Sequence, residues 1–402
     1  MNSLDETLER DLAALRRQHL RRELCRIDSP PGTRLEMNGR TLLNFASNDY
    51  LGFANDPRLK EAAVRAVEIF GAGSGASRLI CGSLAPHHEL EETLADFKGT
   101  PAALTFSTGY ATAAGTIGAL LGKNDIIVLD KLVHACIVDA ARLSGAKIRV
   151  FRHNDLNDLE DKLKWAVAVS RQPAPVARRI LVVTESVFSM DGDAAPLREI
   201  VALKEKYGAW LMVDEAHATG LYGKRRRGLA EEAGVDSRIE VQMGTLGKAV
   251  GAAGGYICGS RALIDFLIHR ARSFVFSTAP VPAAAAAATA GIRFIQSPAG
   301  NDRRNQLFAR INELNSASAI RNPHFKSAIL PILIGDEDAA LAAATALRER
   351  GIFVPAVRYP TVARGRARLR VTVTAAHTAN DLSQLTSALQ SLRTPHSALR
   401  NE

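Results

Sequence analysis

Lys248 lies in a segment with almost no side chains. It follows the turn Gly244–Gly247 and precedes residues 249–255, which are mostly glycine and alanine. A lysine in a desolvated site loses its proton more easily and can form a Schiff base with a carbonyl compound. The small neighbours would let a bulky planar group approach the backbone. On this segment alone, a surface lysine in a glycine loop is an equally good interpretation.

Asp214 ends an apolar run, and His217 follows three residues later. The run Trp210–Val213 is typical of a buried strand, and ligands of parallel α/β sheets bind at the carboxyl ends of the strands. Asp214 is therefore placed where a buried carboxylate could pair with a protonated ring nitrogen. A metal pair and a helix N-cap remain alternatives for these two residue types.

A third segment suits an anion. Four residues separate the expected strand Ala102–Phe106 from the expected helix Ala111–Leu121, namely Ser107, Thr108, Gly109 and Tyr110. Backbone N–H groups at a helix N-terminus, together with hydroxyl groups, can hold a phosphate. Ordinary capping by serine or threonine is the alternative.

His134 completes the set. It follows the expected strand Asp125–Leu129 and could lie flat on an aromatic cofactor, although a lone histidine is more often structural. A lysine for a Schiff base, a carboxylate for a ring nitrogen, a phosphate cup and a stacking histidine are the parts that a pyridoxal phosphate site needs. The combination is much harder to explain by chance than any one segment, and it predicts such a site.

The elements that would position these residues alternate along the middle of the chain. Short apolar runs, about 20 to 30 residues apart, leave room for a helix between each pair, which indicates a parallel sheet with helices on both faces. The expected strands are Ala102–Phe106, Asp125–Leu129, Ile148–Phe151, Ile180–Thr184 and Trp210–Val213.

Both ends of the chain differ from this middle part. A hairpin is expected over Leu35–Phe45, turning at Asn38 and Gly39, and strands are expected over Ala328–Ile334, Ile352–Val357 and Arg368–Thr374. We therefore expect an N-terminal helical arm and hairpin (1–48), a large cofactor-binding domain (49–285) and a small C-terminal α/β domain (286–402).

Composition excludes several classes of protein. The 402 residues are 47% hydrophobic and 23% charged, which are ordinary globular values. The N-terminus has no apolar signal segment, and no run is long and apolar enough to span a membrane. The cysteines, Cys25, Cys81, Cys136 and Cys258, form no C-x-x-C pair, so we expect no metal site, no disulfide framework and a cytoplasmic location.

The net charge of +9 favours acidic partners. Basic residues cluster at 16–26, 224–227 and 364–370. These clusters lack the interleaved aromatic residues of a single-strand binder, so a nucleic-acid-binding protein is only a remote alternative.

The chain resembles the α-oxoamine synthases, which are fold-type I pyridoxal-phosphate enzymes. The resemblance runs from about residue 20 to about residue 392. The matching segments are Asn44–Gly52, Gly73–Arg78, His153–Asp155, Thr184–Asp193, Val213–His217, Gly244–Lys248, Phe276–Thr278 and Leu369–His377. The resemblance implies a mostly parallel seven-stranded sheet in the large domain, and a homodimer with active sites at the subunit interface.

The resemblance also implies a role for each matching residue. Lys248 would be the Schiff-base lysine and the acid/base at the substrate α-carbon, Asp214 would pair with the pyridinium nitrogen, His217 would bond the ring hydroxyl, and His134 would stack on the ring. Cofactor contacts would further come from Ser107, Thr108, Gly109, Tyr110, Glu185, Ser189, Thr245 and, in the partner subunit, Ser277 and Thr278. Substrate would be bound by Arg22, Asn48, Ser189, Arg358 and Thr361.

The reaction implied is the decarboxylative condensation of L-alanine with a pimeloyl thioester of coenzyme A or of an acyl-carrier protein. Glycine C-acetyltransferase, 5-aminolevulinate synthase and serine palmitoyltransferase share most of the motifs and stay open as alternatives, as does a non-catalytic partner subunit. Three residues depart from the usual pattern: Glu215, Tyr359 and Ala76. Tyr359 and Ala76 lie in segments that touch substrate and bear on its choice.

Overall fold

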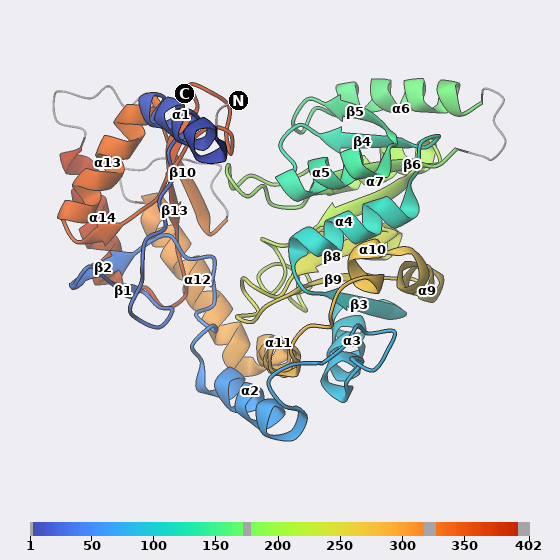
Figure 1. Ribbon diagram of the computed structural model, residues 1–402, viewed down its shortest axis with the longest axis horizontal. Helices are drawn as coiled ribbons and strands as arrows, with labels where there is room; N and C mark the ends of the chain where they lie inside the picture. The colour runs from blue at the N-terminus through green and yellow to red at the C-terminus, as the bar shows by residue number, and fades with distance from the viewer. Residues whose placement is uncertain (1–2, 172–177, 317–326, 393–402) are drawn as a thin grey trace. The chain divides into compact units, whose positions relative to one another are not determined.

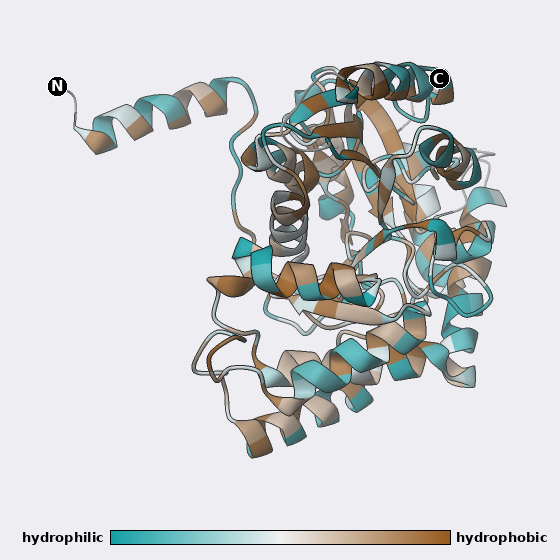
Figure 2. Cartoon of the chain, turned by 90° about the vertical axis from the view of Figure 1, so that its right-hand side faces the viewer, coloured by the Kyte–Doolittle hydropathy of each residue, from teal (hydrophilic) through white to brown (hydrophobic). Residues whose placement is uncertain are grey.

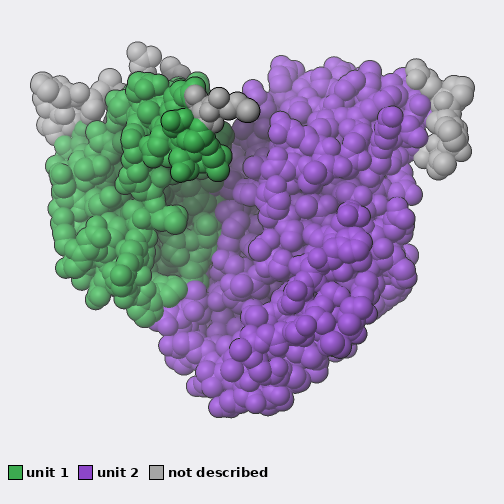
Figure 3. All heavy atoms as spheres, viewed as in Figure 1, with its two compact units in different colours: residues 1–50, 190–192, 306–402 green, residues 51–189, 193–305 purple. Residues whose placement is uncertain are grey.

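The computed structural model describes residues 3–171, 178–316 and 327–392. Within this part of the chain there are two compact units, coloured separately in Figure 3. The large unit comprises residues 51–189 and 193–305, and the small unit comprises residues 1–50, 190–192 and 306–402 as far as they are described.

A seven-stranded sheet forms the centre of the large unit, with the strand order β3-β9-β8-β7-β6-β4-β5. Strand β9 runs antiparallel to both of its neighbours, β3 and β8, and all other neighbouring pairs are parallel. The strands are β3 (Ala102–Phe106), β4 (Ile126–Asp130), β5 (Lys147–Phe151), β6 (Ile180–Glu185), β7 (Trp210–Asp214), β8 (Val241–Thr245) and β9 (Gly255–Gly259). The expected α/β fold with a mostly parallel sheet is confirmed.

Helices cover both faces of this sheet (Figure 1). Side chains of a strand alternate between faces, so Ile127 and Leu129 of β4 join one core and Ile126 and Val128 join the other. This explains why the strands are apolar at consecutive positions. The helices of the unit are α2 (Pro57–Phe70), α3 (Ala85–Lys98), α4 (Gly109–Leu120), α5 (Ala135–Ser144), α6 (Leu156–Ser170), α7 (Leu197–Lys206), α8 (Leu229–Glu232), α9 (Arg261–Arg270), α10 (Arg272–Val275) and α11 (Pro282–Gln296).

The small unit contains two three-stranded sheets, β1-β2-β11 and β10-β13-β12. The expected hairpin turns where φ is +51° at Asn38 and +70° at Gly39, as a type I′ turn requires. Its elements are α1 (Leu4–Arg17), β1 (Arg34–Met37), β2 (Arg40–Asn44), β10 (Ile329–Gly335), α13 (Glu337–Glu349), β11 (Ile352–Phe353), β12 (Ala356–Val357), β13 (Ala367–Thr372) and α14 (Ala379–Ser391).

The division into units differs from the three parts expected from the sequence (1–48, 49–285 and 286–402). The N-terminal hairpin belongs to the small unit because β2 pairs in parallel with β11. Helix α11 belongs to the large unit because it packs on α2 and α3. The C-terminal boundary, between residues 305 and 306, therefore falls inside α12 (Pro298–Ser316).

One expected strand of the small unit was wrong. Residues 352–357 form two short strands, and β11 pairs with β2 while β12 pairs with β13. Pro355 lies between them and has no N–H group to donate to a sheet. The single apolar run therefore serves two different sheets.

In Figure 2, helix α1 at the N-terminus shows apolar positions between hydrophilic ones. Its leucines recur every three or four residues and are all exposed, with Leu4 at 73%. No helix in the described part of the chain is long and apolar enough to cross a membrane.

Candidate active site

Three neighbouring strands bring the lysine loop and the anion segment to one edge of the large sheet. Gly255 at the start of β9 pairs with Phe106 at the end of β3 and with Thr245 at the end of β8. A Cβ atom on Gly255 would lie 2.4 Å from Thr112 Oγ1 and 2.9 Å from the Gly109 nitrogen. Glycine is therefore required for α4 to begin this close to the sheet.

The loop after β8 is closed by its own backbone. The Leu246 amide donates to the Gly254 carbonyl, and the Gly251 amide donates to the Lys248 carbonyl, both at 2.9 Å. Gly251 has a φ of +77°, and a Cβ there would lie 2.6 Å from Phe53 Cβ. Within this loop Lys248 Nζ lies 2.8 Å from His217 Nε2.

Asp214 is the last residue of β7 and is buried at 5% exposure. Its Oδ1 atom accepts the Ala216 amide at 2.9 Å. Burial raises the pKa of Asp214, and the Lys248 ammonium, the Ala216 amide and His134 oppose that rise. The carboxylate is thus held next to the lysine, with donors that favour its ionised form.

Glu185 is the second carboxylate at this edge, opposite Asp214 in the β6–β7 register. Burial and the negative charge of Asp214 raise the pKa of Glu185 to about 8. The amides of His134 and Ser189 donate to it. Burial thus raises the pKa of both neighbouring carboxyl groups, and the Lys248 ammonium opposes the rise at each.

His134 is the N-cap of α5, and its Nδ1 atom accepts the Cys136 amide at 3.2 Å. Partial desolvation lowers the pKa of His134, although the charge of Asp214 opposes this. The lowered pKa favours the neutral form of the ring.

The anion segment forms the start of α4. Thr108 is the N-cap, and its hydroxyl accepts the Ala111 amide at 3.0 Å, so the capping alternative is also realised. The first amides of a helix have no acceptor within it, which leaves those of Gly109 and Tyr110 for a ligand. The Tyr110 hydroxyl donates to Asp139 Oδ2 at 2.9 Å and so ties α4 to α5.

Two expected cofactor residues lie in a different part of the large unit. Thr278 forms an isolated β-bridge with Ser77, and Ser277 Oγ donates to the Thr278 carbonyl. The hydrogen bonds described for these two side chains do not include Lys248 or Asp214.

Of the five expected substrate residues, Ser189 belongs to the large unit, and the other four belong to the small unit. Arg22 donates to Thr361 Oγ1 at 3.2 Å, and Arg358 donates to the carbonyl oxygens of His19 and Arg21. Arg22, Arg358 and Thr361 are thus brought together from distant parts of the sequence. Asn48 lies apart from them and accepts hydrogen bonds from Tyr50 and Arg370, both at 3.1 Å.

The basic cluster at 364–370 is only partly a surface feature. Arg368 and Arg370 are each 5% exposed, and Arg368 pairs with Asp191 at 2.6 Å. The alternation of β13 therefore does not separate a buried face from a solvated one, because both faces of this strand are covered.

Sequence reasoning assigned no role to His153, which follows β5 as His134 follows β4. Its ring lies between Asp130 and Asp193, at 2.9 and 2.7 Å. These two contacts, here called the His153 clamp, hold the base of the segment 186–195. Val187 and Ala194 form a β-bridge in this segment, which also contains Ser189. Polar residues often follow the strands of a parallel sheet, and that pattern could have identified His153 from the sequence.

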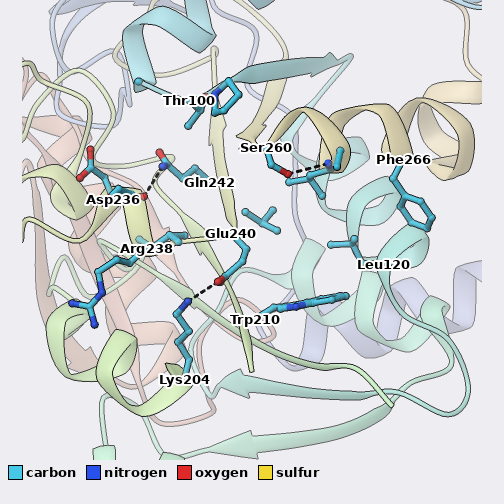
Figure 4. A pocket seen from close by; sticks show the side chains of 18 of the residues that line it. Thr100, Leu120, Lys204, Trp210, Asp236, Arg238, Glu240, Gln242, Ser260 and Phe266 are labelled. Carbon is cyan, nitrogen blue, oxygen red and sulfur yellow. Dashed lines mark hydrogen bonds and ion pairs between the residues drawn. The ribbon is translucent and has the colours of Figure 1, made fainter. Parts of the chain in front are cut away.

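A cavity of about 1010 Å³ lies at the opposite edge of the sheet, where β7 and β8 begin (Figure 4). It is lined by none of the expected site residues. Its charged residues pair with one another, as Lys204 does with Glu240 and Arg238 with Glu205. Arg179 also lines the cavity and donates to the Leu120 carbonyl at 2.7 Å. No group of three or more residues that could hold a metal ion occurs in the ranges that the structure describes.

Known proteins resemble this chain over nearly its whole length. Proteins named 8-amino-7-oxononanoate synthase from Anaeromyxobacter dehalogenans and Anaeromyxobacter sp. strain Fw109-5 are 48% and 50% identical, over 94% and 96% of this chain and 93% and 96% of theirs.

Solved structures agree in fold. A Sphingomonas wittichii serine palmitoyltransferase has a TM-score of 0.88 at 32% identity, covering 97% of this chain and 98% of its own. A Francisella tularensis 8-amino-7-oxononanoate synthase has a TM-score of 0.72 at 27% identity, covering 87% and 97%. The model of the aminotransferase class I and II family matches residues 40–389. The chain therefore belongs to the class I and II aminotransferase family.

Proposed function

We propose that the chain is a pyridoxal-phosphate-dependent acyltransferase that makes 8-amino-7-oxononanoate for biotin biosynthesis. It condenses L-alanine with a pimeloyl thioester and releases carbon dioxide and a free thiol. The observation that carries this is the contact between Lys248 Nζ and His217 Nε2, 2.8 Å apart, at the edge where Asp214 ends β7. The relatives at 48% and 50% identity carry the same activity in their names.

The residues present fit the cofactor. Gly109 has no side chain at the start of α4, where a Cβ atom would meet nothing nearer than Met243 Cε at 4.0 Å. The α4 amides suit a phosphate. When bound, pyridoxal phosphate supplies a ring that accepts the electrons left on the amino-acid α-carbon. Asp214 would hold a proton on the ring nitrogen, and His134 would lie against the ring.

Lys248 would hold the cofactor covalently through Nζ and then move the proton of the alanine α-carbon. His217, in contact with Nζ, would fix that atom's position and bond the ring hydroxyl. The phosphate would be bound by Ser107, Thr108, Gly109, Tyr110 and Thr245, and Glu185 and Ser189 would line the site beside Asp214.

The small unit would supply substrate binding. Arg358 would receive the carboxylate of the amino acid, and Arg22, which contacts Thr361, would lie near the acyl chain. Asn48 would line the substrate side. Either coenzyme A or an acyl-carrier protein would suit the positive net charge, since both are anionic.

We further propose a homodimer in which Ser277 and Thr278 complete the partner's phosphate cup. Segments 74–80 and 276–281 lie together, through the Ser77–Thr278 bridge and the Ala279–Ala76 hydrogen bond. Their large apolar side chains are exposed, with Ile80 at 78% and Phe276 at 72%. Exposed apolar surface of this kind supports an interface. The four free cysteines fit a cytoplasmic location.

The test is a substrate panel on purified protein with identification of the product mass. Alanine, glycine and serine are each combined with acetyl, succinyl, pimeloyl and palmitoyl thioesters. We expect turnover with alanine and a pimeloyl donor. Preference for serine and palmitoyl donors would instead indicate a serine palmitoyltransferase, the activity of structures with TM-scores up to 0.89.

A further inference from the structure

A buried ion pair lies behind the turn that carries Asp214 and His217. Lys98, the last residue of α3, places its Nζ atom 2.5 Å from Glu215 Oε2, and each side chain is only 1% exposed. Lys98 also donates to the Arg227 carbonyl at 2.5 Å. The other carboxylate oxygen of Glu215 accepts the Ala230 amide at 2.9 Å.

The surrounding chain makes room for this pair. Gly228 has a φ of +141°, and a Cβ atom there would lie 2.3 Å from the Glu215 carboxylate. Any residue with a side chain at position 228 would displace that carboxylate. The Glu215 side chain is thus held from three segments: the end of α3, the loop at 227–228 and the start of α8.

Glu215 is also the residue from which the site turn is built. Its amide donates to the Met243 carbonyl of β8, and its carbonyl accepts the amides of Ala218 and Thr219, all at 2.9 Å. Asp214 precedes it and His217 follows two residues later. A displacement of Glu215 would therefore move both residues that face Lys248.

The charge of Lys98 is needed because acidic groups crowd this edge. Asp214 is surrounded by Lys248, His134, Glu185 and Glu215, and Glu215 by Lys98, Asp214, Tyr256 and Cys258. Burial lowers the pKa of Lys98, but the charge and hydrogen bond of Glu215 raise it by more. The net pKa is raised, so Lys98 stays an ammonium. Without it, a buried carboxylate would be stranded next to Asp214.

We infer that Lys98 and Glu215 are a positioning pair, which anchors the 214–217 turn from behind and so orients Asp214 and His217 toward the cofactor. The inference rests on the proposed function for the cofactor it names. Both side chains are only 1% exposed, so the proposed role is indirect and involves no contact with cofactor or substrate.

The experiment compares the full-length wild type with Lys98→Met, Lys98→Arg and Lys204→Met. Lys204 makes an ion pair of the same 2.5 Å length with Glu240, at the opposite edge of the sheet, and serves as the matched control. Each protein is loaded with pyridoxal phosphate. The measurements are cofactor affinity by dialysis, visible circular dichroism of the bound cofactor, and the Tm of the cofactor-free form.

For Lys98→Met we expect roughly tenfold weaker cofactor binding and an altered visible circular dichroism band, because the turn loses its anchor. Lys98→Arg keeps the charge and should restore most of both. Lys204→Met should lower Tm without changing either cofactor signal. If Lys98→Met lowers only Tm, the pair is merely structural and the inference is wrong.

Should Lys98→Met fail to fold, the double variant Lys98→Met/Glu215→Gln decides the question, since it strands no charge. The same loss of affinity and change in the band are expected. Wild-type affinity in the double variant would overturn the inference. These signals do not depend on the acyl donor, so a wild type that binds cofactor but fails the substrate panel would refute the proposed reaction and leave this test intact.

Discussion

Asp214 and Glu185 lie side by side at the carboxyl edge of the sheet, and they differ in the donors around them. Asp214 has the Lys248 ammonium nearby and the Ala216 amide on Oδ1. Burial and the charge of Asp214 raise the pKa of Glu185 to about 8. Burial raises the pKa of Asp214 as well, and buried carboxyl groups with a shifted pKa are typical of functional sites. We propose that Asp214, which accepts the Ala216 amide near the Lys248 ammonium, is the group that holds a proton on the ring nitrogen.

Replacing Asp214 by asparagine tests this at the residue scale. We expect kcat to fall by at least about 100-fold, or about 2.7 kcal/mol of transition-state stabilisation, because the neutral amide no longer holds a proton on the ring nitrogen. Steady-state kinetics of the cofactor-loaded variant measure the loss. The exposed Asp265→Asn on α9 is the control. A rate for Asp214→Asn close to that of the control would refute the pairing.

At the scale of elements, the site depends on how closely α4 approaches β9. We expect Gly255→Ala to weaken cofactor binding by about tenfold, because the new methyl group would press on Thr112 and Gly109 and displace the amides that bind phosphate. The measurement is the dissociation constant of pyridoxal phosphate.

Gly118→Ala is the control, because Gly118 lies in α4 and has nothing within 4 Å of the added Cβ. It should keep wild-type affinity and stabilise the helix by about 0.5–1 kcal/mol. Equal affinities in the two alanine variants would contradict the account of α4.

The His153 clamp makes a pH-dependent prediction. Burial lowers the pKa of His153, but its hydrogen bonds to Asp130 and Asp193 raise it to about 10, from a value of 6.5 outside the fold. A raised pKa means that the clamp stabilises the protein fully below about pH 6.5 and that this contribution is lost as the pH rises toward 10.

The difference in Tm between wild type and His153→Gln should therefore be largest near pH 6 and smallest near pH 10. Taking the difference removes the effects of other titrating groups that both proteins share. A difference in Tm that stays constant across this range would show that the charge of His153 does not contribute.

Much of the large sheet could be predicted from the sequence, because buried parallel strands are continuous apolar runs. The five expected strands correspond to β3, β4, β5, β6 and β7 within one residue at either end. Strands β8 and β9 were not predicted from pattern. Gly244 lies near the end of β8, and Gly255 and Gly259 begin and end β9. Glycine in a strand weakens the usual signal.

The site residues that could be predicted from the sequence are those at strand ends or among small residues. Asp214 ends a strand, and Lys248 and His134 each follow one, so the topology of the sheet brings them to one edge. Lys98 and Glu215 gave no local signal, since their pairing joins positions 117 residues apart. Burial of Arg368 depends likewise on Asp191, which lies 177 residues away.

At the scale of the whole molecule, the proposed homodimer predicts that one subunit can complement another. Lys248→Ala and the double variant Ser277→Ala/Thr278→Ala should each have little or no activity. Mixed and re-dimerised, they should recover up to about a quarter of wild-type activity, because about half of the dimers are hybrids and each hybrid has one complete site. No recovery, with hybrid dimers confirmed by mass spectrometry, would indicate that each subunit builds its site alone.

The central claim is that Lys248 holds pyridoxal phosphate in a site that acts on alanine. The most direct measurement is borohydride reduction of the cofactor-loaded protein, followed by peptide mass spectrometry. We predict a visible absorbance band that reduction removes, and a phosphopyridoxyl mass on the peptide containing Lys248, with both absent in Lys248→Ala. Prior addition of L-alanine should lower the labelling by displacing the lysine. A label on another lysine, or a borohydride-sensitive band that persists in Lys248→Ala, would contradict the account.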